Sequence, residues 1–140
     1  MAIEEAKRAQ EAGEVPVGCI VVRDGEILAS ARNEREVSSD PAGHAEILAL
    51  REAGRRMGSW RLCESTVYCT LEPCCMCAGA MINARVKRLV YGLADPKSGA
   101  CGSVVNIPEL KALNHSMEVR GGMMQERVLE IMQEFFRSRR

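Results

Sequence analysis

The chain has 140 residues, 46% of them hydrophobic and 27% charged, a composition typical of one soluble globular domain. Lysine plus arginine equals aspartate plus glutamate, 19 against 19, which argues against a generic basic protein that binds nucleic acid by phosphate neutralisation. No apolar run approaches a membrane span, nothing resembles a signal peptide, and seven cysteines, an odd number, indicate reduced thiols, so we expect a cytoplasmic protein.

Hydrophobic periodicity and turn signals predict alternating helices and strands. In chain order we expect a helix at 2–12, strands at 15–22 and 27–33, a polar loop at 34–43, a helix at 44–53 ending near Gly54, a connector at 55–64, a strand at 66–70, a helix at 75–84, a strand at 86–91, a loop at 92–102, a short strand at 117–120 and an amphipathic helix at 123–137. Asp24-Gly25 is a strong hairpin turn between the first two strands. A hairpin followed by strand–helix crossovers predicts an α/β sandwich, with residues 1–140 as a single domain.

The stretch Pro73-Cys74-Cys75-Met76-Cys77 follows the strand at 66–70 and begins a helix. Proline suits the first turn of a helix because its missing N–H would have had no partner there. Cys74 and Cys77 are three residues apart and therefore share one face, where the positive end of the helix dipole favours thiolates. Two thiolates so placed form half of a zinc site.

His44 and Glu46 supply a second motif at the start of the helix predicted at 44–53. Positions i and i+2 face nearly opposite ways inside a helix, so both residues cannot be ligands from a helix interior. At a helix N-terminus, however, a metal can lie off the end with His44 bound to it and Glu46 beside it. That arrangement suits Glu46 as a proton carrier rather than as a ligand.

Two other interpretations of these residues stay open. A structural zinc site would take a fourth ligand, from Cys63, Cys69 or Cys75, but it leaves the charge of Glu46 unexplained. A thioredoxin-like redox site would use the Cys-x-x-Cys motif but has no use for His44 and Glu46.

His-x-Glu followed by Pro-Cys-x-x-Cys resembles the signature of zinc-dependent nucleobase deaminases. The resemblance covers nearly the whole chain and implies the cytidine-deaminase-like fold, a three-layer α/β/α structure with a mixed sheet of about five strands. It narrows to the bacterial tRNA-specific adenosine deaminase family. The residues that carry this narrower resemblance are Val15-Pro16-Val17-Gly18, Asn33, His44-Ala45-Glu46-Ile47, Leu71-Glu72-Pro73-Cys74, Met76-Cys77-Ala78-Gly79-Ala80-Met81, Asp95-Pro96-Lys97-Ser98-Gly99, Asn114-His115 and Phe135-Phe136-Arg137.

By this resemblance the protein would be a homodimer that converts the wobble adenosine of an arginine tRNA anticodon to inosine. His44, Cys74 and Cys77 would hold one Zn²⁺ per subunit, and Glu46 would carry protons between a zinc-activated water, the adenine ring and the departing ammonia. Asn33 would hydrogen-bond the flipped adenine. The implied contacts to the anticodon stem-loop come from the loop at 95–98 and from the end of the last helix: Asp95, Lys97, Ser98, Phe136, Arg137, Arg139 and Arg140.

Several of these residues also have plain structural interpretations. Asn33 and Asp95 can simply form turns, and the terminal arginines can be a solvated chain end. Phe135 and Phe136 are adjacent and cannot both face the core, so one of them can stack on a base or pack on a dimer partner. We expect His115 to make a structural hydrogen bond and Cys75 to be buried filler that points away from the metal.

Two alternative functions remain from the sequence. The first is a deaminase of a free base or nucleoside, such as guanine or cytosine, with the same zinc centre. The second is a zinc-stabilised RNA-binding module without activity, in which a protein ligand fills the fourth zinc position.

Overall fold

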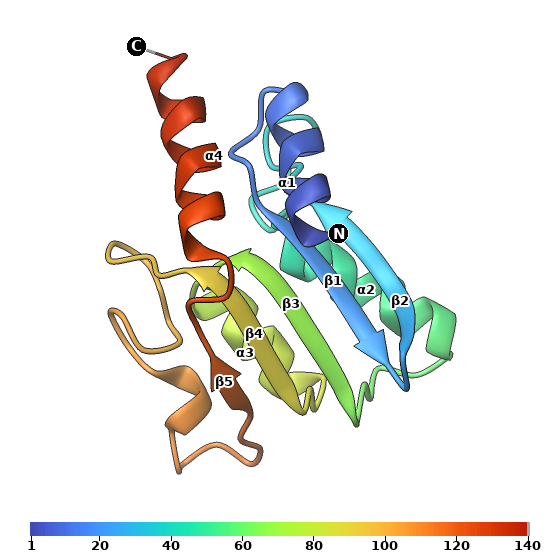
Figure 1. Ribbon diagram of the computed structural model, residues 1–140. Coiled ribbons are helices and arrows are strands. Elements are labelled where there is room, and N and C mark those ends of the chain that lie inside the picture. The colour runs from blue at the N-terminus through green and yellow to red at the C-terminus, as the bar shows by residue number, and fades with distance from the viewer. Residues whose placement is uncertain (140) are drawn as a thin grey trace.

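A computed structural model describes residues 1–139 (Figure 1). The helices are α1 (Ala2–Glu11), α2 (Ala45–Met57), α3 (Cys75–Asn83), the short 3-10 helix η1 (Ile107–Glu109) and α4 (Gln125–Arg137). The strands are β1 (Gly18–Arg23), β2 (Glu26–Arg32), β3 (Ser65–Leu71), β4 (Arg88–Leu93) and β5 (Glu118–Arg120). No helix among the described residues combines the length and the apolar character that crossing a bilayer requires.

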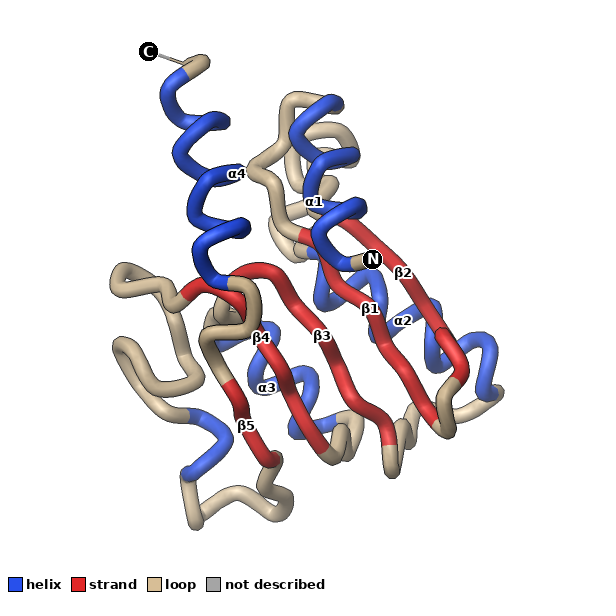
Figure 2. The backbone as a smooth tube through the Cα atoms, viewed as in Figure 1, coloured by secondary structure: helices blue, strands red, loops and turns tan. Residues whose placement is uncertain are grey.

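The five strands form one mixed sheet in the order β2-β1-β3-β4-β5. β1 pairs antiparallel with β2 and with β3, whereas β3, β4 and β5 run parallel to one another. Helices α2 and α3 cover one face of the sheet, and α1 and α4 lie on the other (Figures 1 and 2). The predicted three-layer α/β/α architecture is therefore confirmed.

Small residues bring α2 close to the sheet. Ala45, Ala49 and Ala53 recur every four residues along one face of the helix, and all three are fully buried. They pack in the same core as Cys19 and Val21 of β1, which are also fully buried. Because methyl groups let a helix backbone approach a sheet closely, this face fixes the position of α2 and of the side chains at its N-terminus.

The structure corrects the bounds of two predicted elements. The helix expected to end near Gly54 continues through Gly54 to Met57 and ends at Gly58, which has a left-handed backbone with φ of 66°. The strand expected at 86–91 is β4 at Arg88–Leu93, because the Val86 N–H bonds the Met81 carbonyl and so belongs to the turn after α3.

Two further differences lie at the start of β1 and in the long connection after β4. β1 begins at Gly18 rather than at residue 15, since Pro16 has no N–H for the sheet. The connection between β4 and β5 includes η1, which the sequence did not predict and which Figure 2 shows as a short helix between loops.

Candidate active site

The side chains of His44, Cys74 and Cys77 meet between the N-termini of α2 and α3. His44 and Cys74 are the N-cap residues of these helices, and both have extended backbones, so their side chains lie off the helix ends. His44 Nδ1 lies 3.6 Å from Cys74 Sγ and 3.5 Å from Cys77 Sγ. All three potential ligand atoms lie within 4.8 Å of one another.

This geometry fits a tetrahedral zinc ion. With a Zn–N distance of about 2.0–2.1 Å and a Zn–S distance of about 2.3 Å, tetrahedral angles separate nitrogen from sulfur by about 3.5 Å. The group has three donors among the residues that the structure describes. Three protein ligands with a remaining open position are typical of a catalytic zinc site, whereas a structural site is closed by four.

The other cysteines do not complete a fourth ligand position. Cys75 was expected to be buried, but it is exposed because it lies on the solvent face of the first turn of α3. Cys63 is also exposed, and Cys69 contacts Cys19 across the sheet with 3.5 Å between the sulfurs. His115 is not near this group: its Nε2 lies 2.8 Å from the Val86 carbonyl oxygen, which confirms its structural hydrogen bond.

The three donors influence one another's protonation. The hydrogen bond from Cys77 lowers the pKa of the Cys74 thiol to about 4, helped by the hydrogen bond from His44 and opposed by burial. The same hydrogen bond to Cys74, together with burial, raises the pKa of Cys77. The hydrogen bond to Cys74 also raises the pKa of His44. A thiolate at Cys74 is therefore ready to bind a soft cation before any metal arrives.

Glu46 lies in the first turn of α2 and is only 4% exposed. Burial raises the pKa of its carboxyl, against the lowering effects of a backbone hydrogen bond and of His44. It lines a cavity of about 200 Å³ together with His44 and Cys74. The cavity has the dimensions of a small molecule or a single nucleobase, and two of the three donors, His44 and Cys74, lie in its wall beside the buried carboxyl of Glu46.

Asn33 also lines this cavity, directly after β2. Its Nδ2 donates to the Val15 carbonyl at 3.2 Å, and its Oδ1 accepts from the Arg35 N–H at 3.2 Å. These two bonds fix the orientation of the amide and leave one N–H and one oxygen lone pair for a ligand.

Asp95 and Ser98 lie at the mouth of the same cavity. The Asp95 carboxylate accepts from the backbone N–H groups of Lys97 and Ser98 and, at 2.8 Å, from the Ser98 hydroxyl. Asp95 thus forms the turn that its position before Pro96 indicates, and the turn presents Lys97 to solvent.

The end of α4 and the 95–98 turn enclose an open groove of about 850 Å³, lined in part by Lys97, Phe136 and Arg137. Phe135 is buried and Phe136 is 48% exposed, as adjacency on a helix requires. Arg139 also lines the groove, but its guanidinium donates to the Gly13 carbonyl and lies 4.5 Å from the Phe135 ring centroid. Arg140 lies outside the described residues.

Sequence reasoning missed the role of Glu72, which is 2% exposed. Its carboxylate accepts the backbone N–H groups of Asp95, Cys101 and Ser103 at 2.9–3.2 Å and also the Ser103 hydroxyl. Although burial opposes it, this set of donors lowers the pKa of Glu72. The signal in the sequence was the position of Glu72, an acidic residue between a predicted strand and Pro73. A carboxylate that is buried at such a position needs hydrogen-bond donors around it.

Glu72 requires glycine at position 99. A Cβ atom on Gly99 would lie 2.4 Å from Glu72 Cδ and 2.6 Å from the Asp95 carbonyl oxygen. We expect Gly99→Ala to displace the 95–103 loop and to lower the free energy of unfolding by about 1–3 kcal/mol, measured by urea denaturation. Gly79→Ala is the matched control: this α3 position has open space, so the substitution should not destabilise the protein. Equal stability of the two variants would contradict the proposed tight contact.

Known proteins similar to this chain are deaminases. The MafB19-like deaminase family matches residues 1–140. A tRNA-specific adenosine deaminase of Bacillus subtilis (strain 168) is 45% identical over 139 residues, covering 99% of this chain and 86% of that protein. One from Haemophilus influenzae is 44% identical, with 99% and 81% covered. A structure from a study of A-to-I editing by tRNA:A34 deaminases at the wobble position superposes with a TM-score of 0.90 at 40% identity, covering 93% of this chain and 94% of that one.

Proposed function

The chain belongs to the MafB19-like deaminase family and to the tRNA-specific adenosine deaminases, and on this premise we propose that it hydrolyses the wobble adenosine of a tRNA anticodon to inosine and ammonia. One observation carries the proposal: the cavity of about 200 Å³ combines His44, Cys74 and buried Glu46, and the 95–98 turn separates it from a groove with an exposed aromatic ring and cations. The resemblance of the motifs supports an arginine tRNA as the substrate.

His44, Cys74 and Cys77 would hold one Zn²⁺ in each subunit, as their spacing allows. When bound, the ion would supply Lewis acidity that brings the pKa of a water molecule towards about 7. Cys74 and Cys77 contribute thiolate charge, and the positions of α2 and α3 keep the three donors in place before the metal binds.

Glu46 is proposed as the proton carrier. It takes a proton from the attacking water, whose oxygen bonds to the amine-bearing ring carbon of adenine. The carboxyl delivers this proton to the ring nitrogen. It then takes the second proton from the hydroxyl group now on the ring carbon, as that group becomes the carbonyl of inosine, and passes it to the amine, which leaves as ammonia. Burial supports this role because it raises the pKa of Glu46 and keeps proton acceptance and donation close in free energy.

The cavity and the groove divide the recognition of RNA into two parts. The cavity takes the flipped adenine, with the free N–H and lone pair of Asn33 available to its edge. The groove offers Phe136 for stacking and Lys97 and Arg137 for phosphates. An anticodon loop already presents partly unstacked bases, so flipping costs less than it does in a duplex, and a protein of balanced charge needs only this local patch.

We extend the proposal to the assembly and location of the protein. Residues 1–140 act as one deaminase domain, the active form is a homodimer, and it acts in the cytoplasm. All seven cysteines are free thiols in the structure, consistent with a reducing compartment.

A deaminase of free guanine, cytosine or a nucleoside remains the second candidate, because the cavity by itself would take a free base equally well. The two are distinguished by one assay: zinc-loaded protein with an anticodon stem-loop that carries a wobble adenosine, and in parallel with free adenosine, guanine and cytosine. We expect inosine in the stem-loop and no ammonia from the small substrates. Ammonia from a free base alone would leave the zinc chemistry standing and remove the tRNA proposal, and no product from any substrate would favour a zinc-stabilised binding module.

A further inference from the structure

A guanidinium group lies at the mouth of the cavity and no role described above uses it. Arg35 is exposed and lines the cavity wall together with Asn33 and His44. Its positive charge is close enough to the His44 imidazole for the two groups to interact electrostatically. Within residues 1–139, the side chain of Arg35 makes no hydrogen bond or ion pair, in contrast to Arg32 nearby, which pairs with Glu5.

The backbone around Arg35 is firmly held although its side chain is free. The Arg35 N–H donates to Asn33 Oδ1, and its carbonyl accepts from the Asp40 N–H at 3.1 Å. The next two N–H groups, of Glu36 and Val37, donate to the two oxygens of the Glu14 carboxylate at 3.1 and 2.7 Å. The backbone of this loop therefore holds the unpaired Arg35 guanidinium beside the cavity, and no ligand is needed to order the loop.

Glu14 anchors this loop to the rest of the protein. It is 1% exposed and follows Gly13 in the turn between α1 and β1, so it belongs to the folded body rather than to the loop. A buried carboxylate with hydrogen bonds to two backbone N–H groups is a strong anchor, because charge-assisted bonds are about twice as strong as neutral ones. Glu14 and Glu72 thus hold the two loops on either side of the cavity in the same way.

We propose that Arg35 binds an RNA phosphate next to the adenosine in the cavity and that Glu14 is the positioning residue that holds it there. This inference rests on the proposed function. The ligand class follows from the chemistry: a nucleotide whose base enters the cavity keeps its phosphodiester links at the mouth, and a planar guanidinium with five N–H donors matches phosphate oxygens. With equal numbers of acidic and basic residues, affinity for RNA depends on such local cations.

The test compares Arg35→Gln with the wild type on the anticodon stem-loop, as zinc-loaded full-length protein. We expect KM to rise about tenfold while kcat changes less than about twofold. The plot of log(kcat/KM) against log salt concentration should become less steep by about 0.7–0.9, the contribution of one phosphate. Arg35→Lys keeps the charge and should recover most of the salt dependence but only part of the KM, because it loses the planar donor pair.

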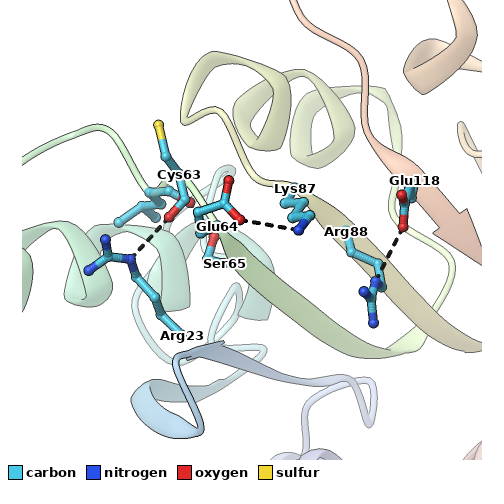
Figure 3. Close-up of polar contacts among 8 residues, drawn as sticks. Arg23, Cys63, Glu64, Ser65, Lys87, Arg88 and Glu118 are labelled. Carbon is cyan, nitrogen blue, oxygen red and sulfur yellow. Dashed lines mark hydrogen bonds and ion pairs between the residues drawn. The ribbon is translucent and has the colours of Figure 1, made fainter.

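Arg88→Gln is the matched control. Arg88 lies at the end of β4 that is far from the site. The opposite end of that strand lies beside the site, because the Leu93 carbonyl there accepts the Glu72 N–H. Figure 3 shows its ion pair with Glu118, at 3.4 Å, near the pair of Lys87 with Glu64. This exposed pair contributes little stability. The control removes the same charge and should leave KM and the salt dependence unchanged.

A neutral methylphosphonate at one linkage beside the wobble adenosine tests the contact itself. At the linkage that Arg35 binds, neutralisation should raise KM in the wild type but not in Arg35→Gln, because the two changes remove the same interaction. Glu14→Gln should likewise raise KM in the wild type and add little to Arg35→Gln. Additive effects at both flanking linkages, or a salt dependence of Arg35→Gln equal to that of the wild type, would overturn the inference. The proposed function fails separately, if the wild type forms no inosine in the stem-loop.

Discussion

Glu46→Gln should give a folded, zinc-loaded protein that deaminates the stem-loop about 10²- to 10⁴-fold more slowly than the wild type. The amide keeps the volume and the hydrogen-bonding capacity of the buried side chain but cannot take a proton from water or pass one to ammonia. Because the loss lies in the chemical step, kcat should fall while KM stays close to the wild-type value. The loss is measured as the rate of inosine formation under single-turnover conditions, and the zinc content of the variant is determined in parallel.

The matched control for this prediction is Glu52→Gln on the same helix. Glu52 is partly exposed and pairs with Arg55 rather than facing the cavity, so its neutralisation should leave turnover unchanged. Glu46→Gln should also unfold within a few degrees of the wild type, since a neutral amide avoids the cost of burying a charge. Substantial turnover by a zinc-loaded Glu46→Gln protein would contradict the proton-carrier role and direct attention to another acid in the cavity wall.

The elements that were predicted correctly are those with local signals. Asp24-Gly25 makes the hairpin, and both residues have the positive φ that such a turn needs. Pro73 correctly marks the start of α3, but it lies one residue before the N-cap Cys74 rather than in the first turn of the helix. The strand order could have been predicted as well, because the hairpin and the strand–helix crossover leave few possible arrangements of the strands. The end of α2 could not be predicted, since Gly54 and Gly58 look alike in sequence and only the packing of the helix decides which one ends it.

The same distinction between local signals and long-range contacts applies to the candidate site. His44, Glu46, Cys74 and Cys77 could be predicted as one group from two short motifs and their resemblance to a family signature, and the structure brings the three donors together. The supporting contacts could not, because they join distant residues: the Glu14 carboxylate binds N–H groups 22 and 23 positions away, and Arg139 reaches Gly13. Backbone N–H groups have no sequence signature, so a carboxylate that binds them is indistinguishable from a solvated one until the fold is known.

Cys74→Ala should abolish zinc binding and activity together and should also destabilise the protein. The thiol is one of three donors from two helices, and two remaining ligands hold zinc far more weakly than three. Since zinc bound only to the folded state adds to stability, its loss should lower the midpoint of thermal unfolding by at least about 5 °C. Metal analysis after gel filtration, thermal unfolding and the stem-loop assay measure the three effects.

Cys75→Ala distinguishes loss of the metal from loss of a cysteine at the same helix start. Cys75 is exposed and lies outside the donor group, so this variant should keep zinc, stability and activity. A chelator should lower the unfolding midpoint of the wild type and of Cys75→Ala but leave that of Cys74→Ala unchanged, because that variant has no metal to lose. If Cys74→Ala instead retained about one zinc per chain, or if the chelator destabilised it equally, the ion would be held elsewhere and the three-donor centre would be wrong.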